Sequence, residues 1–266
     1  MPYVKTNDGC RIYYELHGLE SSRPVVVFLN GTMQSTSYWK THSDVLKNRF
    51  SVLMYDARAQ GKSDLGQKEL SLEIHTSDLS MLLSRLGIEK AHLVGLSHGA
   101  IVALSYAALS PEYIDKLVLC SVSENPSARA RLIVRSWLEI LKSSDLETLA
   151  WASLPVAFGE NFLKQKEKTL CNIVKAIVKR NKKESLVAQL NALAVYPPLS
   201  DIARKVRAPS LFISGSDDPF VTGKKTRQLA KLCGGTHKQI KGSGHSIPAE
   251  APELFIKTVM DFICEA

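Results

Sequence analysis

Short apolar runs alternate with longer segments of helical periodicity over the first 120 residues. The runs are rich in β-branched residues and lie at 24–29, 50–55, 91–96 and 114–120. Because these runs have no polar face, they predict strands buried on both sides in a largely parallel sheet. A half-exposed strand is expected at 10–17, where apolar and polar positions alternate. The segments between them have helical patterns, at 37–47, at 72–86 and from the end of the 91–96 run up to residue 109. This alternation predicts an α/β fold with helices on both faces of the sheet.

The pattern changes after residue 121. From about 125 to 206 only helical periodicities occur, at 131–142, 146–157, 162–180 and 184–195. Strand and helix signals then return, at 209–214, 222–232, 237–240 and 252–264. A segment this long is not a simple loop of a compact domain. We therefore predict a core made of residues 1–122 and 207–266, with residues 123–206 inserted as a helical cap, or lid.

The sequence Gly95-Leu96-Ser97-His98-Gly99 joins an apolar strand to a helix rich in small residues. Glycines two positions on either side of a serine are what a sharp, strained turn between strand and helix requires. Such a turn lifts the serine hydroxyl clear of the sheet and places it at a helix N-terminus, which favours developing negative charge. Ser97 is therefore the candidate nucleophile, although the same glycines would also suit a tightly packed, inert connection.

A nucleophilic serine needs a base, and the base needs a carboxylate that orients it. The segment Gly215-Ser216-Asp217-Asp218 follows a predicted strand, at the sheet edge where sites of open α/β folds lie. The segment Gly242-Ser243-Gly244-His245 follows the last predicted strand, and its glycines leave room for an imidazole to reach the serine. Serine, acid and histidine thus occur in the chain order of the nucleophile-elbow hydrolases.

Composition and charge narrow the class of protein. The 266 residues are 45% hydrophobic and 23% charged, and no apolar run approaches the length of a membrane span. Five scattered cysteines without a C-x-x-C pair favour reduced thiols over disulfides or a zinc site. No signal-peptide pattern occurs at the N-terminus, so a cytoplasmic location is expected. We expect no metal, no cofactor and no nucleic-acid partner.

The net charge of +8 is unevenly distributed. Residues 123–206 contain 14 Lys or Arg against 8 Asp or Glu, whereas the rest of the chain is almost balanced. A basic face steers acidic ligands or proteins toward it, although a solvated helix surface has the same composition.

The motifs together resemble the α/β-hydrolase superfamily over essentially the whole chain. The matching residues are Asn30-Gly31 with Trp39 downstream, Asp56-x-Arg58-x-x-Gly61-x-Ser63, the elbow at Ser97, Gly215-x-x-Asp218, and Gly242-x-Gly244-His245 with Glu250-x-Pro252. The family's spacing selects Asp218 over Asp217 as the acid, and Glu124 is the alternative place where relatives keep it. The resemblance also implies an oxyanion hole made by the backbone N–H groups of Thr32 and His98. Relatives usually have His-Gly where this chain has Asn30-Gly31.

The resemblance implies a serine hydrolase that cleaves a carboxylic ester, lactone or thioester through an acyl-enzyme. The chain is similar to carboxylesterases of the 3-oxoadipate enol-lactonase and pimeloyl-carrier-protein methyl ester esterase kind. Asn30, Trp39, Arg131 and Arg135 are the expected substrate contacts, and the basic cap suggests an acidic acyl carrier protein as a partner. A carbon–carbon bond hydrolase and a ligand-binding receptor with a hydrolase pocket remain alternatives.

Overall fold

The computed structural model describes residues 2–19 and 23–265 and contains one sheet of eight strands in the order β1-β2-β4-β3-β5-β6-β7-β8. β1 and β2 pair antiparallel with their neighbours, and the remaining strands are parallel. The strands are β1 (Tyr3–Lys5), β2 (Arg11–His17), β3 (Val25–Leu29), β4 (Ser51–Tyr55), β5 (Ala91–Leu96), β6 (Ile114–Cys120), β7 (Ser210–Gly215) and β8 (Thr236–Ile240). The predicted α/β fold is confirmed, but the three-residue β1 was not predicted.

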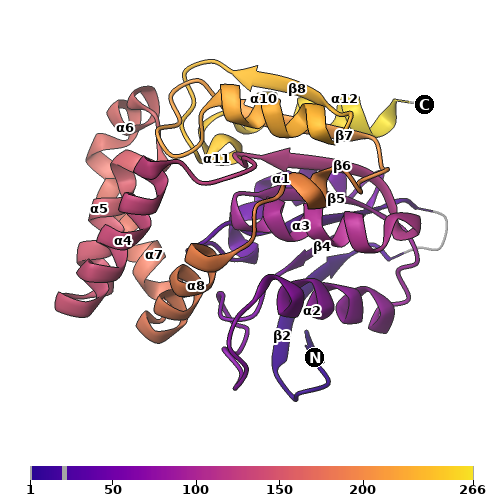
Figure 1. Ribbon diagram of the computed structural model, residues 1–266, viewed down its shortest axis with the longest axis horizontal. Helices are drawn as coiled ribbons and strands as arrows, with labels where there is room; N and C mark the ends of the chain where they lie inside the picture. The colour runs from indigo at the N-terminus through magenta and orange to yellow at the C-terminus, as the bar shows by residue number, and fades with distance from the viewer. Residues whose placement is uncertain (1, 20–22, 266) are drawn as a thin grey trace.

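Helices cover both faces of this sheet (Figure 1). One face packs against α2 (Leu72–Arg85), α3 (His98–Leu109) and α10 (Gly223–Leu232). The other packs against α1 (Lys40–Leu46) and α12 (Pro252–Cys264). Along β3, Val27 contributes to the first cluster, and Val26 and Phe28 to the second. Successive side chains of a strand point to opposite faces, so an entirely apolar strand supplies both cores.

A group of helices from the segment between β6 and β7 gathers at one side of the sheet (Figure 1). It comprises α4 (Ala128–Ser143), α5 (Leu146–Ala157), α6 (Glu160–Lys166), α7 (Leu170–Arg180) and α8 (Lys183–Val195). These helices share a hydrophobic cluster of their own, which also takes in Met33 from the loop after β3. The segment therefore has its own core and contacts the loops at the carboxyl ends of the strands.

The helix expected at 162–180 is interrupted, so that prediction is wrong in detail. A turn of 3-10 helix, Glu167–Thr169, separates α6 from α7. Residues 164–169 are six consecutive polar residues, and the apolar residues on either side, Leu163 and Leu170, both pack against the shared cluster. A continuous helix needs an apolar position every three or four residues to stay packed, and this stretch has none.

Two smaller differences concern short elements. The helix expected at 37–47 begins as a 3-10 turn, Thr36–Trp39, before α1. The short helices α9 (Ser200–Ala203) and α11 (Ile247–Glu250) and the 3-10 turn Pro111–Tyr113 were not predicted. Within the described residues, no helix has both the length and the apolar character needed to span a bilayer.

Candidate active site

Ser97 occupies the sharp turn between β5 and α3. Its backbone is in an unusual conformation for a non-glycine residue, with φ of 53° and ψ of −115°. A Cβ atom on Gly95 would lie 2.6 Å from the carbonyl oxygen of Gly99, and one on Gly99 would lie 2.3 Å from that of Leu29. Both contacts are too short for a side chain. The turn therefore requires glycine at both positions, as the sequence pattern indicated.

Three side chains from separate loops form a hydrogen-bonded chain. The Nε2 atom of His245 lies 2.9 Å from the Ser97 Oγ atom, and its Nδ1 atom lies 2.8 Å from the Asp218 Oδ2 atom. Since the carboxylate accepts, Nδ1 carries the proton and Nε2 is free to accept the serine O–H. Ser97 follows β5, Asp218 follows β7 and His245 follows β8, so all three lie at the carboxyl ends of parallel strands.

The Asp218 carboxylate is held rigidly. Its Oδ1 atom accepts the backbone N–H groups of Phe220 and Val221, both at 2.8 Å. The Asp218 side chain is fully buried, whereas 14% of the His245 side chain is exposed. Two backbone donors compensate the buried charge on one oxygen and leave the other to orient the imidazole.

The other two candidate acids do not contact His245. Asp217 is exposed, and its carboxylate accepts a hydrogen bond from its neighbour Ser216. Glu124 lines the cavity described below, but its only recorded hydrogen bond within the described residues is made by its backbone carbonyl, to the N–H of Leu199. The geometry thus favours Asp218.

The loop after β3 presents the first expected oxyanion donor. Within the described part of the chain, the Thr32 N–H group has no recorded hydrogen-bond acceptor, and Thr32 lines the same cavity as Ser97. The side chain of Gln34 shapes this loop, because its Oε1 atom accepts the Gly31 N–H at 2.8 Å. The adjoining Met33 has a positive φ of 65°. The second expected donor, the His98 N–H, opens α3, where a backbone donor has no partner within its helix.

Asn30 and Trp39 do not line the cavity, so the expectation that they contact substrate is corrected. Both are at least 98% buried. The Asn30 amide donates to the carbonyl of Tyr55 and accepts from the Trp39 Nε1 atom at 2.8 Å. Trp39 stacks on Phe28 with ring centroids 4.6 Å apart. These residues support the loop that follows β3.

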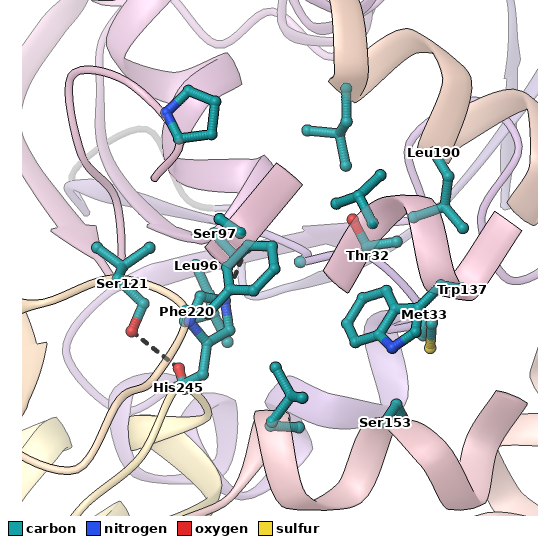
Figure 2. Close-up of a pocket in the computed structure, with 18 of the residues that line it drawn as sticks. Thr32, Met33, Leu96, Ser97, Ser121, Trp137, Ser153, Leu190, Phe220 and His245 are labelled. Carbon is teal, nitrogen blue, oxygen red and sulfur yellow. Dashed lines mark hydrogen bonds between the residues drawn. The ribbon is translucent and has the colours of Figure 1, made fainter. Parts of the chain in front are cut away.

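A cavity of about 430 Å³ is lined by Ser97, by His245 and by helices between β6 and β7. Figure 2 shows part of this lining. Its lining is mostly apolar and includes Met33, Trp137, Leu190 and Phe220. Trp137 lies parallel to Phe220, which also makes an edge contact with the His245 ring. A chamber of this size and polarity suits a small organic acyl group.

Three arginines also reach the cavity. Arg131 and Arg135, predicted from the sequence, are exposed residues of α4. Arg131 donates to the carbonyl of Pro126, and Arg135 pairs with Glu139 at 2.8 Å. The third, Arg180 at the end of α7, was missed. Arg180 follows the exposed Lys179 in a generally basic stretch. Nothing in the sequence of that stretch indicates which basic side chain lines a cavity and which is exposed to solvent.

The side chain of His98 is not part of the cavity lining. Its Nε2 atom lies 3.1 Å from the Tyr196 hydroxyl, and its ring makes an edge contact with His75. Burial lowers the pKa of His98 to about 4, so the ring is neutral at physiological pH. Only its backbone remains a candidate for a role at Ser97. No group of three or more metal-ligating side chains within the described residues is arranged to hold a metal ion.

A mostly parallel sheet with a serine at a strained strand-to-helix turn, facing a histidine and a buried aspartate, defines an α/β-hydrolase type of protein. Residues 26–258 match the sequence profile of the alpha/beta hydrolase family, and the chain belongs to that family.

Individual relatives are distant but cover the whole length. The chain is 27% identical to a putative carbamate hydrolase, RutD, from Caulobacter sp. (strain K31), over 97% of each chain. Its fold matches the enol-lactonase from Burkholderia xenovorans LB400 with a TM-score of 0.91 and 26% identity, covering 99% of this chain and 100% of that one. It also matches MGS-M2, an alpha/beta hydrolase enzyme from a Medee basin deep-sea metagenome library, with a TM-score of 0.92 and 25% identity, covering 99% and 98%.

Proposed function

We propose that this protein is a serine hydrolase that cleaves a carboxylic ester, a lactone or a carbamate through an acyl-enzyme. His245 takes the proton of Ser97, and Ser97 attacks the substrate carbonyl. The N–H groups of Thr32 and His98 stabilise the oxyanion. Asp218 holds the tautomer of His245 and stabilises the imidazolium that forms. The leaving group departs with the proton from His245, and the same histidine then activates the water that releases the acid.

The observation that carries this proposal is the continuous hydrogen-bonded chain from Ser97 Oγ through His245 to Asp218, at 2.9 and 2.8 Å. The same site has an elbow that only glycines permit and a Thr32 N–H group for which no acceptor is recorded among the described residues. A ligand-binding receptor would have no need of this alignment, so we favour an enzyme.

The names of the relatives add further kinds of cleaved bond to the carboxylic esters. One is named a putative carbamate hydrolase and another an enol-lactonase, so we include carbamates and lactones beside simple esters. Thioesters and carbon–carbon bonds remain alternatives that use the same serine chemistry. We also propose that residues 123–206 act as a cap, because their helices supply much of the cavity wall. The acidic acyl carrier protein and the cytoplasmic location stay predictions.

The test is hydrolysis of 4-nitrophenyl esters from acetate to decanoate, with labelling by a fluorophosphonate that reacts with activated serines. Wild-type protein should hydrolyse at least one ester and gain one label, located at Ser97 by peptide mass spectrometry. Ser97→Ala should lose about 10⁴-fold or more in kcat and take up no label. Ser136→Ala, which changes an exposed serine of α4, should behave as wild type. Label on another residue, or full activity in Ser97→Ala, would contradict the proposal.

A further inference from the structure

The cavity carries an excess of positive charge. Among the described residues that line it, Arg131, Arg135 and Arg180 are cationic and Glu124 is the one carboxylate. Arg131 and Arg135 are exposed and have partners on their own part of the chain. Arg180 differs because it is partly buried, and this burial lowers the pKa of its guanidinium without removing the charge.

No carboxylate pairs with Arg180 in the described part of the chain. Its Nε atom donates to the carbonyl of Met33 at 2.9 Å, and its two Nη atoms have no recorded hydrogen bond to any residue that the structure describes. Asp56 is the acidic residue whose charge affects it most, but that carboxylate already accepts the backbone N–H groups of Thr36 and Lys62.

Arg58, an almost fully buried arginine, shows what a guanidinium withdrawn from water usually needs. Arg58 is 2% exposed and forms ion pairs with both Asp8 and Asp78, at 2.7 and 2.8 Å. Withdrawing a charge from water is costly unless an opposite charge compensates it. Arg180 bears part of that cost, because its one recorded partner among the described residues is the neutral carbonyl of Met33. Its side chain also lines the cavity. The missing partner is therefore expected on the ligand.

We propose that Arg180 binds a free carboxylate on the substrate, so that the preferred substrates are monoesters or related derivatives of dicarboxylic acids. This inference rests on the proposed function and specifies its substrate class. With Nε held by Met33, the two Nη groups form a planar pair of donors that matches the two oxygens of a carboxylate. Met33 adjoins Thr32, so the carboxylate site and the oxyanion donor are held by the same loop.

The experiment compares mono-4-nitrophenyl esters of succinate, glutarate and adipate with the neutral butanoate, pentanoate and hexanoate esters. Wild-type protein should prefer the charged ester of at least one length. Arg180→Gln should raise KM for that ester by about 10- to 100-fold, the range expected for a charge-assisted hydrogen bond, and change KM and kcat for the neutral ester less than threefold. Arg180→Lys keeps the charge without the planar donor pair. Its KM for the charged ester should therefore lie between those of the wild type and Arg180→Gln.

Lys179→Gln is the matched control, since it removes one positive charge from the same helix at an exposed position outside the cavity lining. It should leave the preference for charged esters unchanged. If Arg180→Gln lowers kcat equally for charged and neutral esters, Arg180 only supports the oxyanion loop and the inference fails. Absence of any preference in the wild type would also overturn it.

A binding measurement separates the two proposals. Calorimetric titration of Ser97→Ala with monomethyl glutarate or monomethyl adipate should show binding that is lost in Ser97→Ala/Arg180→Gln. If this difference appears although the wild type hydrolyses no ester, the hydrolase proposal fails and the carboxylate site stands. If neutral esters are hydrolysed but the two variants bind equally, the carboxylate site fails and the hydrolase proposal stands.

Discussion

Replacing Asp218 by asparagine should inactivate the protein without unfolding it, and the reason lies in the two backbone donors. The N–H groups of Phe220 and Val221 both point at the Oδ1 atom, so an asparagine must place its carbonyl oxygen there. Its NH₂ group then faces the Nδ1 atom of His245, where Asp218 has a carboxylate oxygen at 2.8 Å. His245 must accept at Nδ1, and its proton moves to Nε2.

In that tautomer Nε2 donates toward Ser97 and no longer accepts its proton. The imidazolium formed during the reaction also loses its buried negative partner. Together these effects should lower kcat/KM by about 10³- to 10⁴-fold, equivalent to roughly 4 to 5.5 kcal/mol of transition-state stabilisation. The assay is steady-state hydrolysis of the best 4-nitrophenyl ester, with the melting temperature measured in parallel.

Asp217→Asn is the control, because that neighbouring carboxylate is exposed and its one recorded hydrogen bond among the described residues comes from Ser216. It should keep wild-type kinetics. A loss below tenfold in Asp218→Asn, or an equal loss in Asp217→Asn, would refute the assignment of Asp218 as the orienting acid. If Asp218→Asn keeps full activity and Glu124→Gln loses it, the orienting acid is Glu124.

Two predictions concern stability. Arg58→Met should lower the free energy of unfolding by about 3 to 5 kcal/mol in urea titrations, because it leaves the buried Asp78 carboxylate without its ion pair; a loss below 1 kcal/mol would contradict this. Burial lowers the pKa of His42 to about 4, so the unfolded chain binds a proton there more readily than the folded one. The contribution of His42 to the free energy of unfolding should therefore be constant above about pH 6.5 and decrease as the pH drops from 6.5 toward 4. At pH 5 His42 alone should lower the free energy of unfolding by roughly 2 kcal/mol. His42→Gln should flatten the decline of melting temperature between pH 7 and 5, and an unchanged slope would show that other groups cause it.

Elements with a strong local pattern were predictable from the sequence. The strand at 25–29 is apolar throughout and those at 51–55 and 114–120 are largely apolar, and a run of that kind has few stable alternatives to a buried strand. The turn at Ser97 was predictable for a related reason, since two glycines at fixed spacing encode a backbone that side chains would block. Local sterics and hydrophobic periodicity act over a few residues, so a single sequence reveals them.

The contacts that define the site depend on residues far apart in the chain. The Oγ atom of Ser97 meets a histidine 148 residues later, and Arg180 reaches the carbonyl of Met33 across 147 residues. Asn30 and Trp39 illustrate the same limit, because their polar atoms satisfy each other beneath the loop instead of facing the cavity. The sequence by itself determined the fold class and a short set of candidate residues. Only the tertiary structure decided which charged groups lie together and which guanidinium faces the cavity, because burial and pairing are set by packing between distant segments.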